Sequence, residues 1–225
     1  MNIINVEHLY KIYGEKIIFD DASFGIQKGD KIGIVGINGT GKSTLLKMIA
    51  GEETPDKGQI IKQNGLNLAY VPQNPVFSED STIRSYALKK GEENWKVESN
   101  LTELNITRFD QKIEHLSGGQ KKRVVLAKIL SDDFDVLLLD EPTNHLDMET
   151  ACWLEGYLKQ YQGAVVMVSH DRFFMDRTAD IIYELDQGKI TRYPGNYTQY
   201  REQKRKNYEI QMKSYLRQQE EIERQ

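Results

Sequence analysis

The stretch GINGTGKS, residues 36–43, decides the fold because it fits the pattern G-x-x-x-x-G-K-[S/T]. Glycines at these positions let the backbone turn sharply and point its N–H groups at the oxygens of a triphosphate. An apolar strand is predicted just before the stretch, over residues 31–35, and a helix just after it, over residues 42–50. Since the positive end of that helix would face the phosphates, the stretch predicts a nucleotide-binding α/β fold.

Two side chains of this phosphate loop have predicted roles. The Lys42 ammonium reaches the β- and γ-phosphate oxygens of a bound triphosphate, and the Ser43 hydroxyl is a ligand of Mg²⁺. The residues predicted to hold the nucleotide are Gly36, Asn38, Gly39, Thr40, Gly41, Lys42, Ser43 and Thr44. A plain glycine turn before a helix is the alternative, but the strand and helix that flank the loop favour nucleotide binding.

A second apolar strand, residues 136–139, ends in Asp140 and Glu141. Open α/β sheets place their sites at the carboxyl ends of strands, so both acids are expected beside the phosphate loop. Asp140 is the candidate for the Mg²⁺ shell, through a water molecule, and Glu141 is the candidate to orient or deprotonate the attacking water. An acidic turn after a strand is the simpler interpretation of these residues alone, but the phosphate loop reverses that preference.

The string LSGGQ, residues 116–120, stands at the start of a helix predicted over residues 118–130. A serine hydroxyl and the free N–H groups of a helix start make a second anion-binding site. An ordinary helix cap is the alternative interpretation. Two anion-binding helix starts in one chain need not face the same nucleotide.

Composition and charge exclude several classes of protein. The chain has 225 residues and a formal net charge of −4, which disfavours a globally basic nucleic-acid binder but allows a local basic patch. Its single cysteine, Cys152, excludes an internal disulfide and a cysteine-rich metal site. So few cysteines fit a protein of the reducing cytosol. No segment approaches the ~18 apolar residues of a spanning helix, and the start lacks the features of a signal peptide. We therefore expect a cytoplasmic protein without direct membrane insertion.

Apolar patterning predicts the remaining elements. Further strands are expected over residues 3–9, 16–24, 58–62, 67–71, 164–168 and 181–185, and further helices over 148–161 and from 198 onward. The first strands follow one another directly, which predicts an antiparallel layer, while strand–helix alternation predicts a parallel core sheet. Residues 76–115 predict a small, mostly helical insertion, and Cys152 is expected to pack within its helix.

Together these motifs resemble an ATP-binding-cassette (ABC) nucleotide-binding domain over residues 1 to about 193. The resemblance implies an ATPase that uses Mg²⁺, with an antiparallel β layer, a parallel-sheet core and a helical subdomain at about 76–130. It also implies that residues 194–225 start a charged linker helix. In this family the signature motif of one cassette closes over ATP held by another, so a second cassette is implied as partner, in a longer chain or a homodimer. The signature residues are Leu116, Ser117, Gly118, Gly119 and Gln120.

The resemblance assigns four further residues. Gln73 matches the loop that senses Mg²⁺ and the attacking water, and His170 matches the switch histidine at the γ-phosphate. Asp147 matches the loop at the dimer seam, although it also fits a plain helix cap. Tyr13 matches the aromatic residue that stacks on adenine, with Tyr10 or an ordinary packing role as alternatives.

Two strings favour one branch of the family. EPTNHLD, residues 141–147, resembles the ABC-F branch, whose members are twin-cassette ATPases acting on ribosomes. YPGNY, residues 193–197, followed by a charged helix, resembles the start of the linker between the cassettes. The resemblance thus implies the ribosome (rRNA or tRNA) as a partner through the linker, in translation or in protection from antibiotics. A basic helix with interleaved tyrosines suits RNA phosphates, while pairing with a second linker helix is an equal alternative.

The competing function is the ATPase subunit of a membrane transporter. That function needs a separate membrane protein, and both Asn144-His145 and the extension over 193–225 argue against it. Only 42 residues separate Gln73 from Leu116, which leaves no room for the long helical arm that some ABC-F members carry there.

Overall fold

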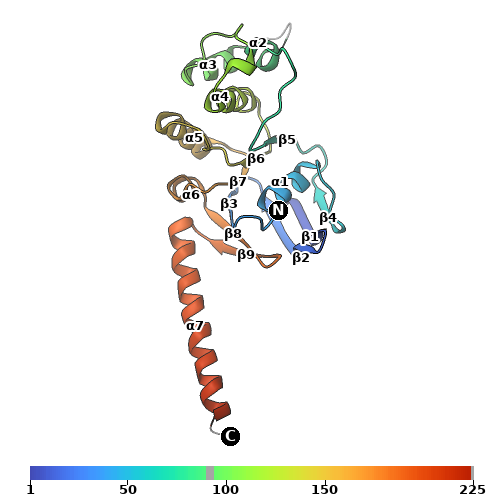
Figure 1. The fold of residues 1–225 in the computed structure, drawn as a ribbon, viewed down its shortest axis with the longest axis vertical. Coiled ribbons are helices and arrows are strands. Elements are labelled where there is room, and N and C mark those ends of the chain that lie inside the picture. Colours follow the sequence, from blue (N-terminus) through green and yellow to red (C-terminus); the bar gives the residue numbers. More distant parts are fainter. Residues whose placement is uncertain (90–93, 224–225) are drawn as a thin grey trace.

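The computed structural model describes residues 1–89 and 94–223, which form two sheets, a group of small helices and one long terminal helix (Figure 1). The smaller sheet is antiparallel, in the strand order β2-β1-β4. Its strands are β1 (Asn2–Tyr13), β2 (Lys16–Gln27) and β4 (Lys57–Lys62). The expected antiparallel layer is therefore present, and its first two strands extend beyond their predicted ends.

The larger sheet has the order β5-β6-β7-β3-β8-β9, and only its last pair, β8 and β9, is antiparallel. Its strands are β5 (Leu68–Val71), β6 (Val136–Asp140), β7 (Ala164–Val168), β3 (Lys31–Val35), β8 (Ile181–Asp186) and β9 (Lys189–Pro194). Every residue of β6 and β7 is buried, as expected of parallel strands covered on both faces. The carboxyl ends of β3, β6 and β7 thus meet at one edge of a rigid sheet.

Helices cover this sheet on both faces and carry the loops of the site. They are α1 (Lys42–Ala50), α4 (Gly118–Ile129), α5 (Met148–Gln160) and α6 (Arg172–Thr178). Two apolar clusters hold the layers together, one between the two sheets and α1, the other between the larger sheet and α4, α5 and α6. The short helix α6 is not predicted from the sequence.

A group of small helices has an apolar cluster of its own at one end of the molecule (Figure 1). It consists of α2 (Ile83–Ala87), α3 (Trp95–Glu103), the 3₁₀ turn η1 (Ile113–His115) and the outer side of α4. Polar contacts tie it to the core: the Trp153 indole on α5 donates to a Glu103 carboxylate oxygen on α3 at 2.8 Å. The predicted helical insertion is thus confirmed as helical within the described residues.

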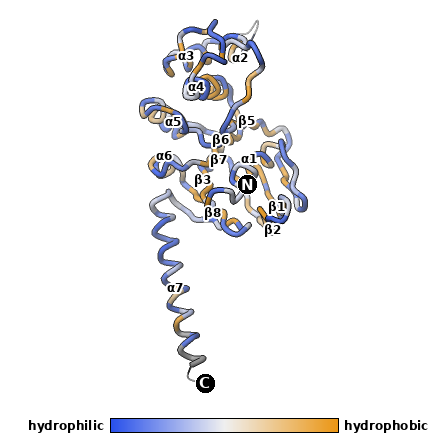
Figure 2. Tube along the Cα trace, in the orientation of Figure 1, coloured by the Kyte–Doolittle hydropathy of each residue, from blue (hydrophilic) through white to orange (hydrophobic). Residues whose placement is uncertain are grey.

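The last element, α7 (Tyr197–Glu223), projects away from the rest of the molecule (Figure 1). Only its base is packed, through the buried Tyr200. Mainly hydrophilic colours run along the helix beyond that point (Figure 2), and Tyr208 and Tyr215 are exposed. None of the helices in residues 1–89 and 94–223 is both long and apolar enough to cross a membrane.

One expectation about packing is wrong. Cys152 lies in α5, but its side chain is exposed, because it stands on the opposite side of the helix from the buried Leu154 and Leu158. The apolar stripe of α5 faces the core as predicted, and Cys152 lies outside this stripe.

Candidate nucleotide site

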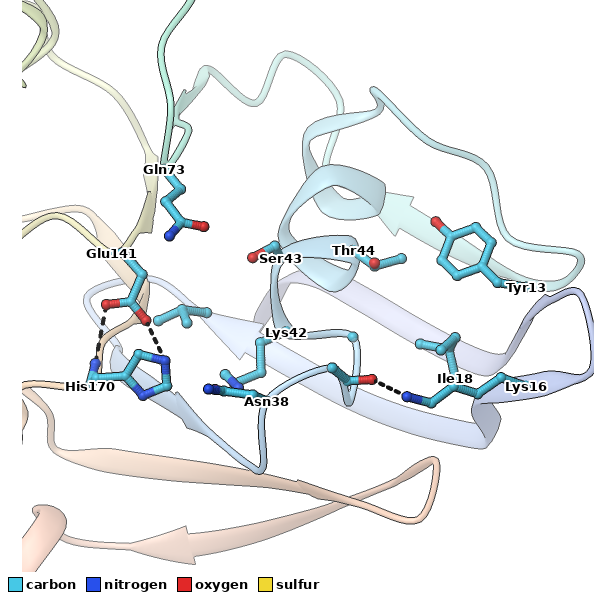
Figure 3. Close-up of a pocket in the computed structure, with 13 residues that line it drawn as sticks. Tyr13, Lys16, Ile18, Asn38, Lys42, Ser43, Thr44, Gln73, Glu141 and His170 are labelled. Atoms are coloured by element: carbon cyan, nitrogen blue, oxygen red, sulfur yellow. Dashed lines mark hydrogen bonds and ion pairs between the residues drawn. The ribbon is translucent and has the colours of Figure 1, made fainter. Parts of the chain in front are cut away.

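A cleft of about 560 Å³ opens at the carboxyl edge of the larger sheet (Figure 3). It is lined by Tyr13, Lys16, Ile18, Asn38, Gly39, Gly41, Lys42, Ser43, Thr44, Gln73, Glu141, Val168 and His170. The cleft combines the phosphate loop, the ends of β6 and β7, and the hairpin of β1 and β2. Most residues predicted to bind or act on the nucleotide therefore lie around one space, although the sequence places them far apart.

The phosphate loop needs its glycines for steric reasons. Gly39 and Gly41 have φ angles of 78° and 102°, in the left-handed region that favours glycine. A Cβ atom on Gly41 would lie 2.2 Å from the Cγ2 atom of Ile18, and one on Gly36 would lie 2.5 Å from the carbonyl oxygen of Leu185. The loop thus passes close to β2 and β8, and its helix α1 starts without a side-chain cap.

Lys42 is held in place by the loop itself. Its buried ammonium donates to the carbonyl oxygens of Gly36 at 3.0 Å and Ile37 at 3.1 Å. Burial lowers its pKa, and the nearby carboxylates of Asp140 and Glu141 act in the opposite direction. The cation is therefore positioned in the cleft before any ligand arrives.

Two residues predicted to hold the nucleotide do not line this cleft. Gly36 lies at the start of the loop, next to β8, and lines a neighbouring cavity instead. The Thr40 hydroxyl and N–H group both donate to the Ile37 carbonyl, at 2.8 Å and 3.3 Å, which closes the turn of the loop. In this structure both residues shape the loop.

Ser43 and Asp140 form a pair suited to Mg²⁺. The Ser43 hydroxyl lies 3.1 Å from Asp140 Oδ1, and the Tyr70 hydroxyl lies 3.5 Å from Asp140 Oδ2. No group of three metal-binding side chains occurs in the part of the chain that the structure describes. Mg²⁺ commonly takes one or two protein oxygens and completes its shell with phosphates and waters, so a hydroxyl beside a buried carboxylate fits it.

Glu141 is the most unusual side chain of the cleft. It is buried, and its backbone has a φ of 48°, which is rare outside glycine. Its Oε2 atom accepts a hydrogen bond from the His170 backbone N–H at 3.2 Å. Its Oε1 atom lies 3.3 Å from His170 Nε2, and within the described residues it accepts no hydrogen bond (Figure 3).

The electrostatics of Glu141 suit a proton acceptor. Burial raises its pKa, while the His170 backbone N–H and, if charged, the ring lower it, and Asp140 raises it further. A carboxylate with a raised pKa and a free oxygen is able to orient or deprotonate a water molecule. Glu141, His170 and Gln73 all reach this cleft, Gln73 from the loop after β5 (Figure 3).

Tyr13 lies at the end of the cleft remote from Glu141 (Figure 3). Its ring is half exposed, its hydroxyl contacts Glu53, and the Lys11 ammonium lies 5.3 Å from its centroid. Tyr10, the alternative, instead has its ring next to the Lys57 ammonium and does not line the cleft. Of the two tyrosines, Tyr13 is thus the one placed to contact a base.

The signature residues lie outside the cleft of their own chain. Leu116 is buried in the small-helix group, and Ser117 caps α4. The Ser117 hydroxyl accepts from the Gln120 N–H at 3.2 Å, and the Gln120 amide oxygen accepts from the Ser117 N–H at 2.9 Å. A Cβ atom on Gly119 would lie 2.4 Å from the His145 carbonyl oxygen, so the helix start packs closely on the loop after β6.

Asp147 is the N-cap of α5. Its Oδ1 atom accepts from the Thr150 N–H at 2.8 Å, and Arg123 lies 3.8 Å from its Oδ2 atom. The capping interpretation is confirmed, and a role at a dimer seam stays a prediction.

Sequence reasoning missed Lys16 and Lys122. The Lys16 ammonium donates to the Gly39 carbonyl at 2.8 Å and lines the cleft. Lys122 on α4 is buried, and its ammonium donates to the carbonyls of Pro72 at 3.0 Å and Asp140 at 3.2 Å. Burial lowers the pKa of Lys122 to about 8. It stands three and seven residues before the apolar Val125 and Ile129, so its place on the apolar face was visible in the sequence.

The parallel sheet, the phosphate loop between β3 and α1, and the acids that end β6 define a P-loop nucleotide-binding ATPase domain. A family model described as ABC transporter matches residues 19–144, more than half of the chain, and a second model with the same description matches residues 183–225. The chain belongs to the ATP-binding cassette family. Cassettes of this family bind and hydrolyse ATP, and the chain is an ATPase domain of this kind.

Individual relatives agree with this assignment. The chain is 41% identical to an uncharacterized ABC transporter ATP-binding protein, YfmR, of Bacillus subtilis, over 88% of this chain and 38% of the relative. It is 39% identical to the energy-dependent translational throttle protein EttA of Escherichia coli K12, over 91% of this chain and 39% of the relative. The chain thus spans about two fifths of the length of these relatives.

A solved ATP-binding subunit of an ABC transporter has the same fold. It superposes with a TM-score of 0.76 at 23% identity and covers 85% of this chain and 90% of that one.

Proposed function

We propose that the chain is an ATP-hydrolysing cassette, residues 1–193, with the start of an interdomain linker, residues 194–225, of a twin-cassette protein that acts on the ribosome. The observation that carries the proposal is that Lys42, Ser43 and Glu141 line one cleft, with Asp140 behind Ser43 at 3.1 Å, while the signature helix lies outside it. Such a cassette binds one ATP molecule in its own cleft, while its signature contacts the ATP bound by another cassette.

The polar residues in and beside the cleft divide the proposed reaction among them. Lys42 and the loop N–H groups hold the β- and γ-phosphates, and Tyr13 contacts the adenine ring. Ser43 and, through a water, Asp140 hold Mg²⁺ with help from Gln73; when bound, the metal neutralises charge on the β- and γ-phosphates. Glu141 orients the attacking water and accepts its proton.

His170 contributes to the same reaction from the end of β7. Its backbone N–H holds the Glu141 carboxylate, and its ring, which is more than half exposed, lies at the phosphate end of the cleft. A ring in this place is able to contact a γ-phosphate without losing its contact with the carboxylate.

The second half of the proposed site comes from another cassette. Residues 116–120 do not line the cleft of this chain, and α4 presents a helix start with free N–H groups beyond its capping box. Head-to-tail closure of two cassettes would place each signature on the other's γ-phosphate. Asp147, at the start of α5, would then lie near the seam.

The names of the relatives and the surface of α7 both support the ribosome as a partner. The E. coli relative is named a translational throttle protein. The first half of α7 carries an excess of Lys and Arg with exposed tyrosines, a surface that suits RNA phosphates and bases. The proposed location is therefore the cytoplasm. A role in ordinary translation and one in antibiotic protection remain the two forms of this hypothesis.

The test uses Glu141→Gln, which keeps the shape of the side chain but removes the proton acceptor. We expect ATP affinity to stay unchanged by calorimetry and turnover to fall by a factor of about 10² to 10⁴. In the longer protein, this variant should accumulate on ribosomes in ATP but not in ADP, as measured by co-sedimentation. Equal turnover in wild type and variant would remove Glu141 from the reaction.

Ser117→Arg is the matched control for the composite site. It leaves the cleft of this chain intact, so ATP affinity should not change. Hydrolysis by two paired cassettes should fall roughly a hundredfold or more because a donor to the γ-phosphate is blocked. Rapid hydrolysis by a demonstrated monomer at all protein concentrations would show that the composite site is wrong.

A further inference from the structure

A second cavity, of about 360 Å³, adjoins the nucleotide cleft. The two share Lys42 and His170, and the second is bounded by the start of the phosphate loop on one side and the base of α7 on the other. Its volume is at the lower end of the range for small-molecule sites. It is therefore large enough for a small anion with its hydration water, next to the phosphate end of the cleft.

The lining of this cavity is strongly cationic. Arg172 on α6 and Arg201 and Lys204 on α7 join Lys42, and Glu184 is its single carboxylate. In the part of the chain that the structure describes, neither the Arg172 nor the Arg201 guanidinium group has a hydrogen bond or an ion pair. Two unpaired guanidinium groups beside a cavity favour an oxyanion, which they bind through charge-assisted hydrogen bonds.

The charge of the Glu184 carboxylate is offset by its ion pair with the Lys204 ammonium, and two tyrosine hydroxyls occupy its oxygens further. Oε1 accepts from the Tyr200 hydroxyl at 2.7 Å and contacts the Lys204 ammonium, while Oε2 accepts from the Tyr193 hydroxyl at 3.3 Å. Glu184 lies on β8, opposite Val35 at the end of β3. The same contacts fix the base of α7 to β8, the neighbour of the strand that leads into the phosphate loop.

The cationic lining continues outward. A third cavity, of about 400 Å³, shares Arg201 and Lys204 with the second and adds Arg205 and Tyr208 on the exposed side of α7. Neighbouring cavities thus lead from Lys42 to the outer surface of α7, with cationic side chains at each stage. Only Glu202 adds a carboxylate to the third one.

We propose that the second cavity is a binding site for inorganic phosphate and that the phosphate formed from ATP leaves through it. The inference rests on the proposed function, in which ATP and water give ADP and phosphate. A partner signature over the cleft would block its mouth, whereas this cavity lies beside the phosphate end, next to α7, and shares Lys42 and His170 with the cleft. Arg172 and Arg201 hold the oxyanion, and Lys204 and Arg205 continue its path to solvent.

The experiment monitors the arginine side chains directly. The chain, ¹⁵N-labelled and saturated with Mg²⁺ and the non-hydrolysable analogue AMP-PNP, is titrated with potassium phosphate, with potassium chloride of equal ionic strength as reference. Because the analogue fills the γ-phosphate position, saturable shifts of the Arg172 and Arg201 Nε–H signals report the second cavity. We expect such shifts with phosphate only.

Variants identify the residues responsible. The double variant Arg172→Gln, Arg201→Gln should lower the affinity for phosphate at least about tenfold. The phosphorus NMR signal of the titrated phosphate measures this affinity. Arg177→Gln is the matched control: Arg177 is also an exposed arginine of α6, but it pairs with Glu155 at 3.2 Å and does not line the cavity. It should leave phosphate affinity unchanged, and circular dichroism checks that every variant is folded.

The outcomes separate the two hypotheses. Failure of the wild-type chain to bind AMP-PNP would overturn the proposed function. Binding of AMP-PNP without a phosphate-specific shift, or equal phosphate affinity in the double variant and wild type, would overturn the phosphate site alone.

Discussion

Two helices of this chain, α1 and α4, begin at glycine-rich turns, and they satisfy their first N–H groups differently. α1 starts at Gly41, in the left-handed conformation and with no side-chain cap. α4 starts at Ser117, whose hydroxyl and backbone form a reciprocal capping box with Gln120. The uncapped start faces the cleft of its own chain and leaves its donors to a ligand. At the capped start, the Ser117 and Gln120 N–H groups are already bonded within the chain.

The α1 start is therefore a preformed binding site within this chain, whereas the α4 start is a surface that another molecule can contact. The α1 start is enclosed by β2 and β8 and has Lys42 already in position. The α4 start is held by contacts behind it, from Lys122 to Pro72 and Asp140. We therefore expect substitutions at the α1 start to affect both folding and ATP binding of this chain. Substitutions at the α4 start should affect mainly the stability of the chain.

The largest expected effect is a matched pair of glycine substitutions. Gly41→Ala forces a left-handed residue, at ~1–2 kcal/mol, and a contact of 2.2 Å with Ile18, so it should destabilise the chain by about 3 kcal/mol. Gly118→Ala meets nothing closer than 3.9 Å, at His145, and should change stability by less than about 0.5 kcal/mol. Urea unfolding measures both, and equal effects would erase the contrast between the helix starts.

Lys42→Ala should come next, as a loss of ATP affinity of roughly a hundredfold, or about 2.7 kcal/mol, because the ammonium makes charged hydrogen bonds to the phosphates. Lys121→Ala on the first turn of α4 is the control and should leave affinity unchanged. Calorimetry with ATP tests the pair. An unaltered affinity in Lys42→Ala would contradict ATP binding at the start of α1.

Lys122→Met tests how α4 is held, through the pH dependence of stability. The pKa of Lys122 is about 8 in the folded chain, whereas the pKa of a freely solvated lysine side chain is 10.5. Between these values the unfolded chain binds more protons, so wild-type stability should rise with pH relative to Lys122→Met, by on the order of 2 kcal/mol from pH 7 to 10. Parallel stability curves for the two proteins would show that the ammonium is not buried.

The smallest effect is expected for Ser117→Ala, which removes the cap of α4 and should cost about 1 kcal/mol of stability without changing ATP affinity. Ser99→Ala, in the exposed middle of α3, provides a control near zero. A loss of ATP affinity in Ser117→Ala would mean that this helix start contacts the nucleotide of its own chain.

The sequence predicted those parts of the site in which a short pattern and its chemistry coincide. Gly41, Lys42 and Ser43 are neighbours in one loop, and Asp140 and Glu141 end one apolar strand, so local reasoning was enough to place them together. The parallel core sheet follows in the same way from its buried strands.

Features that depend on long-range packing were harder to predict. Whether Tyr10 or Tyr13 reaches the cleft is set by register shifts between β1 and β2, near Leu9 and Lys11, which no alternation of residues reveals. The spacing of Lys122 places it on the apolar face of α4, but its hydrogen bonds to the Pro72 and Asp140 carbonyls depend on how α4 packs against two other elements. The Glu184 contacts join β8, β9 and α7, so the cavity beside them exists only in the folded chain.

The way α7 is attached has a mechanical consequence. Its 27 residues form a rod of about 40 Å, fixed near one end by Tyr200 and Lys204 to the strand next to the phosphate loop. Such a rod is a lever whose fulcrum lies beside the ATP cleft. A rotation of roughly 10° at the fulcrum moves the far end, which is roughly 30 to 35 Å away, by about 5 to 6 Å. A rotation of this size beside the ATP cleft would therefore displace the far end of α7 by about the rise of one helical turn.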